Sequence, residues 1–317
     1  MKRILLLLLV LGAVCSLNAK TRKCLYRVTV TGKRAECPVV IRDVPEWAQS
    51  AVVSLGGVHR IPSQLDRELD ELVFVSDISG SQNFQVLYSS DPDKRVFKKR
   101  VHAQMWLKNP DKTLRAVGCA SLEKNDMYHK LHHHGPAFES EYAACRIYFD
   151  NKQTVDTYGK KRPQLELAET MWYPSDEQLS RGYGHDNLRV FGSVGVGTLK
   201  GWDAEKRKMV HITDFKRREA RILADGPIRT VVEMRVEGWR YGGREITMTS
   251  RYILYAGHGD VQVENRIEGD LRGLVFTTGV MKMAESEVCK NDNVIAAFGR
   301  DFPENDTVKW ERESVGL

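Results

Sequence analysis

The sequence has little helical pattern, and it lacks the motifs of several large enzyme classes. Apolar residues at the three-and-four spacing of an amphipathic helix are scarce, which argues against a mainly helical fold. No GxxxxGKS or GxxxxGKT phosphate loop, GxSxG nucleophile elbow or HExxH zinc helix occurs. These absences argue against a P-loop nucleotidase, an α/β-hydrolase and a zincin-type protease. The cysteines form no CxxC pair and no zinc-ribbon spacing, so a cysteine-based metal framework is not expected.

A long hydrophobic run occurs only at the N-terminus. Two basic residues precede an unbroken apolar segment from Ile4 to Val14, and small and polar residues follow up to Ala19. This order is typical of a secretory signal peptide, and the run is short for a membrane span of ~20 residues. We expect cleavage after Ala19 and an exported protein, periplasmic or secreted, with no membrane span. Lipoprotein processing at Cys15 is the less favoured alternative because Val14 is a poor lipobox residue.

The net charge limits the classes of partner, and the cysteine count limits the possible disulfides. Without residues 1–19 the chain has 46 basic and 42 acidic residues, a net charge of +4. This mild excess is spread along the chain, so no nucleic-acid partner is expected, although an anionic substrate would be weakly favoured. Five cysteines would remain, an odd number that leaves at least one free thiol. Cys24 and Cys37 could close a hairpin as a disulfide, but we favour buried, reduced cysteines.

What the sequence does contain is strand pattern. Several segments alternate apolar and polar residues, or are rich in β-branched and aromatic residues, and Gly, Asp or Ser bound them. They are LYRVTVTG, ELVFVSDI, NFQVLYSS, RTVVEMRVEGW, REITMTSRYILYAG and DVQVENRIEG. One short helix is expected at 175–183, where Ser175 and Gln178 form a capping-box pattern. The sequence therefore predicts an all-β fold of packed antiparallel sheets.

The composition predicts two parts. Residues 20–110 are expected to form a small N-terminal β domain and a basic connector, with turns near 30–38 and 54–64. Residues 111–317 are expected to form the larger β domain. The connector is interpreted as a solvated segment rather than a binding patch. The last ten residues, VKWERESVGL, are typical of the start of a strand, and a truncated C-terminus is one interpretation of this ending.

Three segments carry a resemblance to a known family. They are HHHGPAFESEYAACRIYFDNKQTVDTYGK, GSVGVGTLKGWD and SRYILYAGHGDVQVENRIEG. They resemble the bacterial family labelled domain of unknown function 4861, over nearly all of the chain after residue 19. The resemblance implies exported proteins of polysaccharide-degrading bacteria, often found beside unsaturated glucuronyl hydrolases, and a fold similar to galactose mutarotase, a large antiparallel β-supersandwich. Where an Asp-rich DxDxDG-like insert would be expected, this chain has IPSQLDRELDELVF, so no calcium loop is expected.

The first candidate site lies at residues 132–150, HHHGPAFESEYAACRIYFD. If residues 139–150 form a strand, alternate side chains face opposite sides. One face becomes apolar and belongs to the core, and the other carries Tyr142, Arg146 and Tyr148. These residues offer rings for stacking on a sugar and a fork for a carboxylate, so they are candidate substrate-binding residues. An ordinary solvent-facing strand surface is the alternative.

Glu139 and Glu141 begin the apolar face of that expected strand. Their Cα atoms would lie about 6.6 Å apart, which suits either a retaining or an inverting glycosidase. Both are therefore candidate catalytic residues. An arginine, a histidinium, a metal or solvent must balance the two crowded carboxylates.

The histidines before them are candidates for proton transfer. His133 and His134 would face opposite sides of an extended backbone, and a histidine pKa near ~6.5 suits a general base or acid. Histidines with a glutamate could also hold a divalent metal, so the sequence predicts no certain cofactor and its metal ligands stay unknown. Gly135-Pro136 favours a turn instead, which would make HHHGP an exposed loop.

A second cluster lies at 171–203, where aromatic and titratable residues alternate with glycines. His185 is a candidate acid or base, and Trp172, Tyr183 and Trp202 are candidates for the wall of a sugar cleft. Tyr158, between the two clusters, is a candidate substrate-binding residue and proton donor. For Trp202 a core position is the alternative.

Three functions remain open. The first is an exported lyase or glycoside hydrolase acting on uronate-containing glycans. A lyase would use Arg146 or a histidine for the carboxylate and His134 or His185 as base, whereas a hydrolase would use the two glutamates. The second is a non-catalytic carbohydrate-binding accessory protein, and the third is a mutarotase or epimerase of a released sugar. In each case the partner is a poly- or oligosaccharide. The enzyme hypotheses predict one cleft that collects His133 or His134, Glu139, Glu141 and His185.

Overall fold

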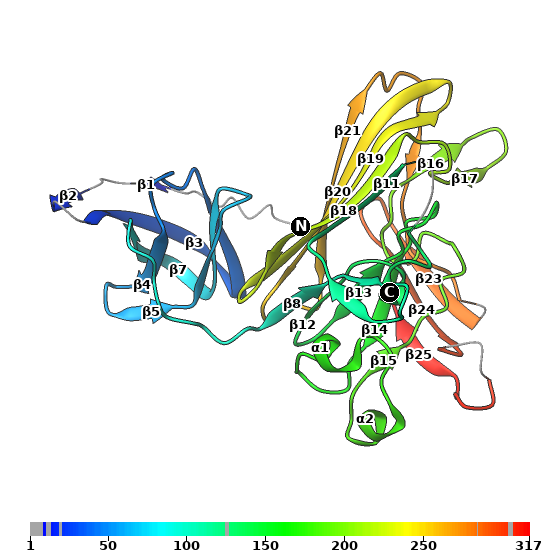
Figure 1. Cartoon of the computed structure of the whole chain (residues 1–317), viewed down its shortest axis with the longest axis horizontal. Coiled ribbons are helices and arrows are strands. Elements are labelled where there is room, and N and C mark those ends of the chain that lie inside the picture. Colours follow the sequence, from blue (N-terminus) through cyan, green and yellow to red (C-terminus); the bar gives the residue numbers. More distant parts are fainter. Residues whose placement is uncertain (1–8, 11–13, 19–20, 124–126, 284, 304–306) are drawn as a thin grey trace.

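The computed structural model describes residues 9–10, 14–18, 21–123, 127–283, 285–303 and 307–317. Most of the expected signal peptide, including the cleavage site after Ala19, lies outside the described residues. Within the described ranges nearly all regular structure is antiparallel β-sheet, so the all-β prediction is confirmed. Figure 1 shows two lobes that meet near the middle of the molecule. No helix among the described residues has the length and apolar character needed to cross a membrane.

The N-terminal lobe is one sheet built around two long strands. β3 (Thr21–Arg42) and β7 (Glu71–Ser89) pair along most of their length, with a register shift after Arg34. Such a bulge bends a strand, and Val28 and Val39, from the two halves of β3, lie in one buried cluster. The other strands of this sheet are β1 (Leu9–Val10), β2 (Val14–Asn18), β4 (Ser50–Leu55), β5 (His59–Ile61) and β6 (Ser63–Asp66).

This lobe corrects two expectations. The turn expected near 54–64 is present between β4 and β5, whereas the turn expected near 30–38 is wrong. There β3 continues through Gly32, which lies opposite Gly80, because the bulge takes up the polar residues without reversing the chain. Cys24 and Cys37 therefore lie in one strand and cannot close a hairpin. Both are buried free thiols, as the favoured interpretation predicted.

The larger lobe is a sandwich of two five-stranded sheets. The first sheet has the order β11 (Cys119–Glu123), β18 (Arg217–Asp225), β19 (Arg229–Tyr241), β20 (Arg244–Tyr255) and β21 (Val261–Gly269). The second has the order β15 (His185–Asp186), β14 (Val155–Gly159), β13 (Ala144–Ile147), β12 (Ala137–Ser140) and β8 (Val101–Gln104). Phe138 and Ile147 of the second sheet pack with Met234 and Tyr252 of the first in one buried cluster.

Smaller elements surround this sandwich. The remaining strands are β9 (Trp106–Lys108), β10 (Leu114–Ala116), β16 (Lys200–Asp203), β17 (Lys208–Val210), β22 (Phe276–Thr277), β23 (Glu285–Lys290), β24 (Ile295–Asp301) and β25 (Glu313–Gly316). The helical turns are η1 (His132–His134), α1 (Leu167–Thr170) and α2 (Asp176–Ser180). The capping box predicted for α2 is confirmed, because the Ser175 hydroxyl accepts from the Gln178 N–H and the Gln178 amide accepts from the Ser175 N–H.

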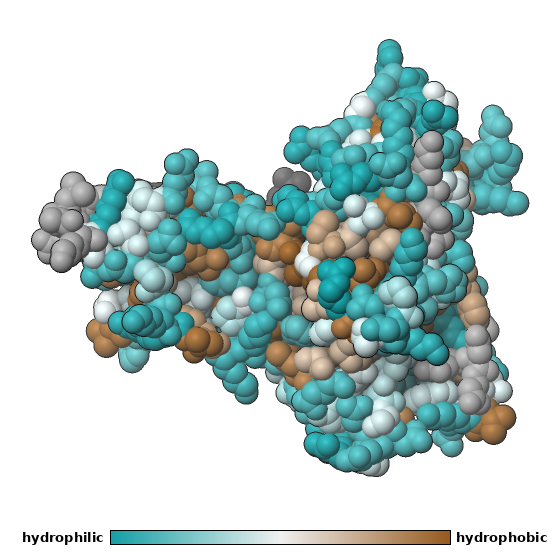
Figure 2. Space-filling view, viewed as in Figure 1, coloured by the Kyte–Doolittle hydropathy of each residue, from teal (hydrophilic) through white to brown (hydrophobic). Residues whose placement is uncertain are grey.

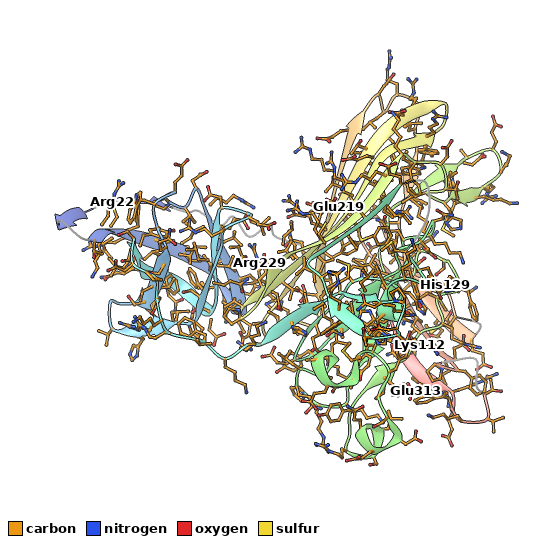
Figure 3. The ribbon with its side chains drawn as sticks, viewed as in Figure 1. Arg22, Lys112, His129, Glu219, Arg229 and Glu313 are labelled. Atoms are coloured by element: carbon orange, nitrogen blue, oxygen red, sulfur yellow. The ribbon has the colours of Figure 1, made fainter. Side chains whose placement is uncertain are left out.

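Buried residues join the two lobes. Val73 of the N-terminal sheet packs with Ile228 and Tyr255 of the large sheet. Arg229, which Figure 3 places at the junction, forms a buried ion pair with Asp66. β8 pairs with β12 and so belongs to the larger lobe's sheet. The expected domain bounds, 20–110 and 111–317, stay a prediction.

Candidate functional site

Three neighbouring strands gather charged side chains on the outer face of the second sheet. In β13, Cys145 and Ile147 point into the sandwich core, so Arg146 points to the opposite face, as the alternation predicted. Arg146 lies directly across from Asp156 in β14, and Tyr158 of β14 lies across from Asp186 in β15. Side chains opposite each other on antiparallel strands are neighbours, so the hairpin register itself assembles the cluster.

Hydrogen bonds tie this cluster together. Arg146 donates to Asp156 Oδ2 from Nε (3.0 Å) and Nη2 (2.7 Å), and Nη2 also lies 2.6 Å from Asp186 Oδ2. The Tyr148 hydroxyl donates to Asp156 Oδ2 at 3.0 Å. Trp172 Nε1 donates to Asp186 Oδ2 at 3.1 Å, and the Trp172 ring lies 4.6 Å beneath the guanidinium carbon of Arg146. The guanidinium group is thus fixed by two carboxylates and an aromatic ring.

Burial sets the protonation of these groups. Burial alone would lower the pKa of Arg146, but Asp156 and Asp186 outweigh it and the pKa is raised. Burial raises the pKa of Asp186 despite the nearby guanidinium group. For Tyr148, burial and then the Asp156 carboxylate raise the pKa, which keeps its hydroxyl protonated at neutral pH. Arg146 is thus held as a cation between the two carboxylates, and the Tyr148 hydroxyl remains a hydrogen-bond donor to Asp156.

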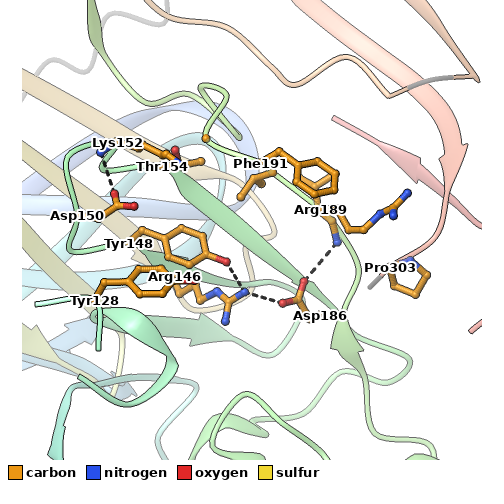
Figure 4. Close-up of a pocket in the computed structure, with 13 residues that line it drawn as sticks. Tyr128, Arg146, Tyr148, Asp150, Lys152, Thr154, Asp186, Arg189, Phe191 and Pro303 are labelled. Carbon is orange, nitrogen blue, oxygen red and sulfur yellow. Dashed lines mark hydrogen bonds and ion pairs between the residues drawn. The ribbon is translucent and has the colours of Figure 1, made fainter. Parts of the chain in front are cut away.

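A pocket of about 380 Å³ opens above this cluster (Figure 4). Arg146 and Asp186 form part of its polar floor. Figure 4 shows the rings of Tyr128 and Tyr148 on one side and Phe191 and Pro303 on the other. The remaining lining residues are Asp150, Lys152, Thr154, Leu188, Arg189, Val190 and Gly192.

Aromatic rings form the two facing walls. Tyr128 stacks on His134 with ring centroids 3.9 Å apart and lies 5.6 Å from the Tyr148 ring. On the opposite wall Phe191 is 70% exposed and has a φ of 44°. A bulky residue in the left-handed region is uncommon, and an exposed phenylalanine gains little from burial. Both features suggest that Phe191 is held at the rim for a ligand.

Besides Arg146, two further cations line the pocket. Arg189 pairs with Asp301 of β24 through Nη2, while its buried Nε has no hydrogen-bond partner among the described residues. A buried unpaired donor in a pocket wall is costly unless a ligand or water satisfies it. Lys152 is exposed, and its side chain lies over Gly192. The pocket therefore offers positive charge at its rim.

The histidines predicted as proton carriers lie behind the pocket rather than in it. His133 and His134 belong to the turn η1 rather than to an extended strand, so the turn expected from Gly135-Pro136 is confirmed. The exposed loop expected with it is wrong, because residues 132–136 are buried or half-buried. His133 is buried, and burial lowers its pKa well below the ordinary value. His134 contacts the Tyr128 carbonyl oxygen through Nδ1 at 2.9 Å, and burial lowers its pKa. The structure makes His134 a support for Tyr128.

The two glutamates do not form a pair. Ser140 ends β12 because its hydroxyl accepts the N–H groups of Tyr142 and Ala143, so residues 139–150 form a hairpin and not one strand. Glu139 is fully buried, forms an ion pair with Lys160 and accepts backbone N–H groups at the start of α1. Burial raises its pKa although Lys160 opposes this. Its acceptor sites are used structurally.

Glu141 and His185 also contact residues that do not line the pocket. Glu141 pairs with Arg100 Nε at 2.5 Å and accepts the Gly257 N–H at 3.0 Å. The side chain of His185 points to the opposite face of the strand from that of Asp186, because consecutive side chains alternate along a strand. Its ring stacks on Trp310 at 4.4 Å, and Nε2 lies 3.0 Å from Glu313. The pocket above Arg146 therefore does not collect His133, His134, Glu139, Glu141 and His185, and the convergence of these residues around one cleft stays a prediction.

The predicted aromatic residues divide between the site and the core. Tyr148 lines the pocket, and Trp172 supports its floor from a fully buried position. Tyr158 is buried, and its hydroxyl donates to Glu166 and the Gly184 carbonyl oxygen. The other three lie outside the pocket lining: Tyr142 is exposed in the hairpin turn, Tyr183 binds Glu169, and Trp202 is half-buried in β16 beside Tyr241.

Sequence patterns alone did not identify five residues of the site: Tyr128, Asp156, Asp186, Arg189 and Phe191. A hairpin centred on Asn151 would have placed Arg146 opposite Asp156, because the numbers of paired residues in a hairpin sum to a constant. No local signal identifies Phe191, whose role depends on distant strands. Among the described residues no group of three or more His, Cys, Asp and Glu side chains could hold a metal ion.

A comparison with models of protein families identifies the family of this chain. The family described as Domain of unknown function (DUF4861) matches residues 35–316, which is most of the sequence, so the chain belongs to this family. Searches of curated proteins and of solved structures found no match.

Proposed function

We propose that this member of the DUF4861 family is an exported carbohydrate-active protein of polysaccharide degradation, and that its pocket binds a uronate-containing poly- or oligosaccharide. The observation that carries the proposal is the pair of facing aromatic walls, Tyr128 with Tyr148 and Phe191, above a polar floor. Pyranose rings have apolar faces that stack on aromatic rings and hydroxyl edges that accept and donate hydrogen bonds. A fold similar to galactose mutarotase is part of this proposal.

The charges at the rim support an acidic sugar. Arg189 Nε is a buried donor without a partner among the described residues, and Lys152 adds a second cation to the lining. A uronate carboxylate would add an acceptor to the Arg189 guanidinium group beside Asp301. A neutral sugar would satisfy it less well, since charge-assisted hydrogen bonds are about twice as strong as neutral ones.

Among the reactions considered, lyase chemistry is favoured over hydrolysis by the two glutamates, because Asp186 and Tyr148 line the pocket whereas Glu139 and Glu141 do not. In a lyase reaction Arg189 would hold the uronate carboxylate, and Asp186 would take the proton from C5. The C4–O bond then breaks, and Tyr148 would protonate the leaving oxygen. The raised pKa of Asp186 suits a base, and the raised pKa of Tyr148 keeps its hydroxyl protonated, so that it has a proton to give. Binding without catalysis and mutarotation of a released sugar would use the same pocket.

The reaction class is tested with the full chain and a panel of acidic and neutral polysaccharides. A lyase forms unsaturated uronides, which are detected by ultraviolet absorbance, and a hydrolase forms reducing ends without that absorbance. Binding of uronate-containing glycans with neither product would establish the accessory function. Absence of binding to any glycan of the panel would refute the proposal.

The aromatic wall is tested with Phe191→Ala. Removing the ring should weaken saccharide binding by about tenfold, since it loses one stacking face. Phe298→Ala is the matched control, because Phe298 is 59% exposed in β24 but does not line the pocket. Isothermal titration calorimetry with a uronate oligosaccharide measures both variants. Equal affinities for the two variants would place the saccharide elsewhere.

A further inference from the structure

The long sheet of the larger lobe ends in a strand with one open side. β21 is last in the order β11-β18-β19-β20-β21, and it pairs with β20 over Val261–Gly269 without a register shift. Among the described residues no strand pairs with its other side. β21 contains no proline or bulge to interrupt its edge, and its charged side chains Glu264, Arg266 and Glu268 include both signs. It therefore presents a regular row of backbone donors and acceptors.

We propose that this edge pairs with β21 of a second copy of the chain, antiparallel and centred on Asn265. A two-fold axis perpendicular to the sheet relates the copies, so the same strand serves both sides of the contact. Residues opposite each other in an antiparallel pair point to the same face of the sheet. The axis must therefore lie between the two copies of one residue, and not between copies of two consecutive residues, which point to opposite faces. The two five-stranded sheets would become one continuous sheet.

Centring on Asn265 makes the strand complementary to itself on both faces. On the charged face, Glu264 would lie opposite Arg266 of the second copy, and this pair would occur twice. On the core face, Val263 would lie opposite Ile267 of the second copy. Val263 and Ile267 are only partly buried at the margin of the sandwich core, so pairing would extend their burial.

The two registers on either side of this one lack this match. An axis through Glu264 places the two Glu264 carboxylates opposite each other. An axis through Arg266 opposes two guanidinium groups and sets Glu264 against Glu268. Arg266 is 80% exposed, and among the described residues its ion-pair partner is Glu268, so its side chain can also reach a partner strand. Figure 2 shows that hydrophilic side chains cover the projecting end of this sheet, where a polar interface of this kind would form.

The first test measures the oligomeric state of the full chain by light scattering after size exclusion and by sedimentation. The wild type should be a dimer that dissociates on dilution. Glu264→Arg opposes two arginines across both symmetric pairs and should raise the dissociation constant about tenfold or more. Glu264→Arg combined with Arg266→Glu should restore dimerisation to within a few fold. A monomeric wild type, or a dimer that Glu264→Arg leaves intact, would overturn the proposal.

The second test measures the register. In a background with the exposed thiols changed, Cys119→Ser with Cys289→Ser, Asn265→Cys should form a disulfide between copies. Opposite Cα atoms lie about 4.5–5.5 Å apart, within the range of a disulfide. Gln262→Cys is the matched control on the same strand, because its two copies would lie about 20 Å apart. Non-reducing electrophoresis should show a cross-linked dimer for Asn265→Cys only. No cross-link at Asn265, or equal cross-linking at Gln262, contradicts the register.

Discussion

At the residue scale, Lys200 is an unusual buried cation. It lies in β16 with no exposed surface, and its ammonium group contacts His211 Nδ1 at 3.2 Å. Burial lowers its pKa from 10.5 to about 8, because Asp150 offsets only part of the desolvation. The folded state therefore binds this proton less tightly than the unfolded chain does, and folding is penalised wherever the lysine is charged.

Lys200→Met should therefore increase the free energy of unfolding at neutral pH, by on the order of 2–3 kcal/mol. The wild type should gain stability as the pH rises from about 8 to 10.5, so the gap between the two proteins should narrow over that range. Lys208→Met, at an exposed position of β17, is the control and should show no such trend. Denaturant unfolding across this pH range measures both. A gap that stays constant up to pH 10.5 would contradict the assignment.

At the scale of elements, Glu139 fastens the β12–β13 hairpin to α1. Its carboxylate binds Lys160, whose side chain is 2% exposed, and accepts the N–H groups of Glu166 and Leu167. Glu139→Ala leaves a buried ammonium group and two backbone donors without this partner, which should cost about 3–5 kcal/mol of stability. Glu139→Met with Lys160→Met should cost less, since it removes both charges together.

Glu141→Ala is the matched control for this element. Its partner Arg100 is one-third exposed and can turn to water, so the loss should stay near ~1 kcal/mol. Denaturant unfolding of each variant measures these losses of stability. A catalytic Glu139 would behave differently, because Glu139→Ala would then abolish turnover while leaving stability intact.

The same hairpin explains what the sequence could and could not predict. Alternation placed Cys145, Ile147 and Arg146 on the correct faces, because the period of two is encoded residue by residue. The break between β12 and β13 was not predicted. It arises because the Ser140 hydroxyl accepts hydrogen bonds from the turn, and no hydrophobic pattern indicates those bonds. The role of Glu139 was missed because its backbone partners lie 27 and 28 residues further along the chain.

At the scale of the whole molecule, a buried polar network crosses the junction between the lobes. The Gln64 side chain accepts the N–H groups of Ile228 (2.8 Å) and Arg229 (2.9 Å). Asp66 pairs with Arg229, and burial raises the pKa of Asp66 even so. Val73 continues the contact into an apolar cluster with Ile228. Buried polar groups on each lobe thus depend on the other lobe for their partners.

This dependence predicts that the two lobes of the wild type unfold in one transition. In Arg229→Met we expect the two lobes to unfold in separate transitions. The variant leaves the Asp66 carboxylate buried without its cation, which should cost about 3–5 kcal/mol, and this loss falls on the junction. Arg42→Met is the matched control: Arg42 also contacts Glu71 but is 72% exposed and lies within the N-terminal lobe. Calorimetry should show one transition for the wild type and the control and two for Arg229→Met, and hydrogen exchange should assign the earlier transition to one lobe. Two transitions in the wild type, or one transition with both lobes exchanging in step in Arg229→Met, would show that this network does not couple the lobes.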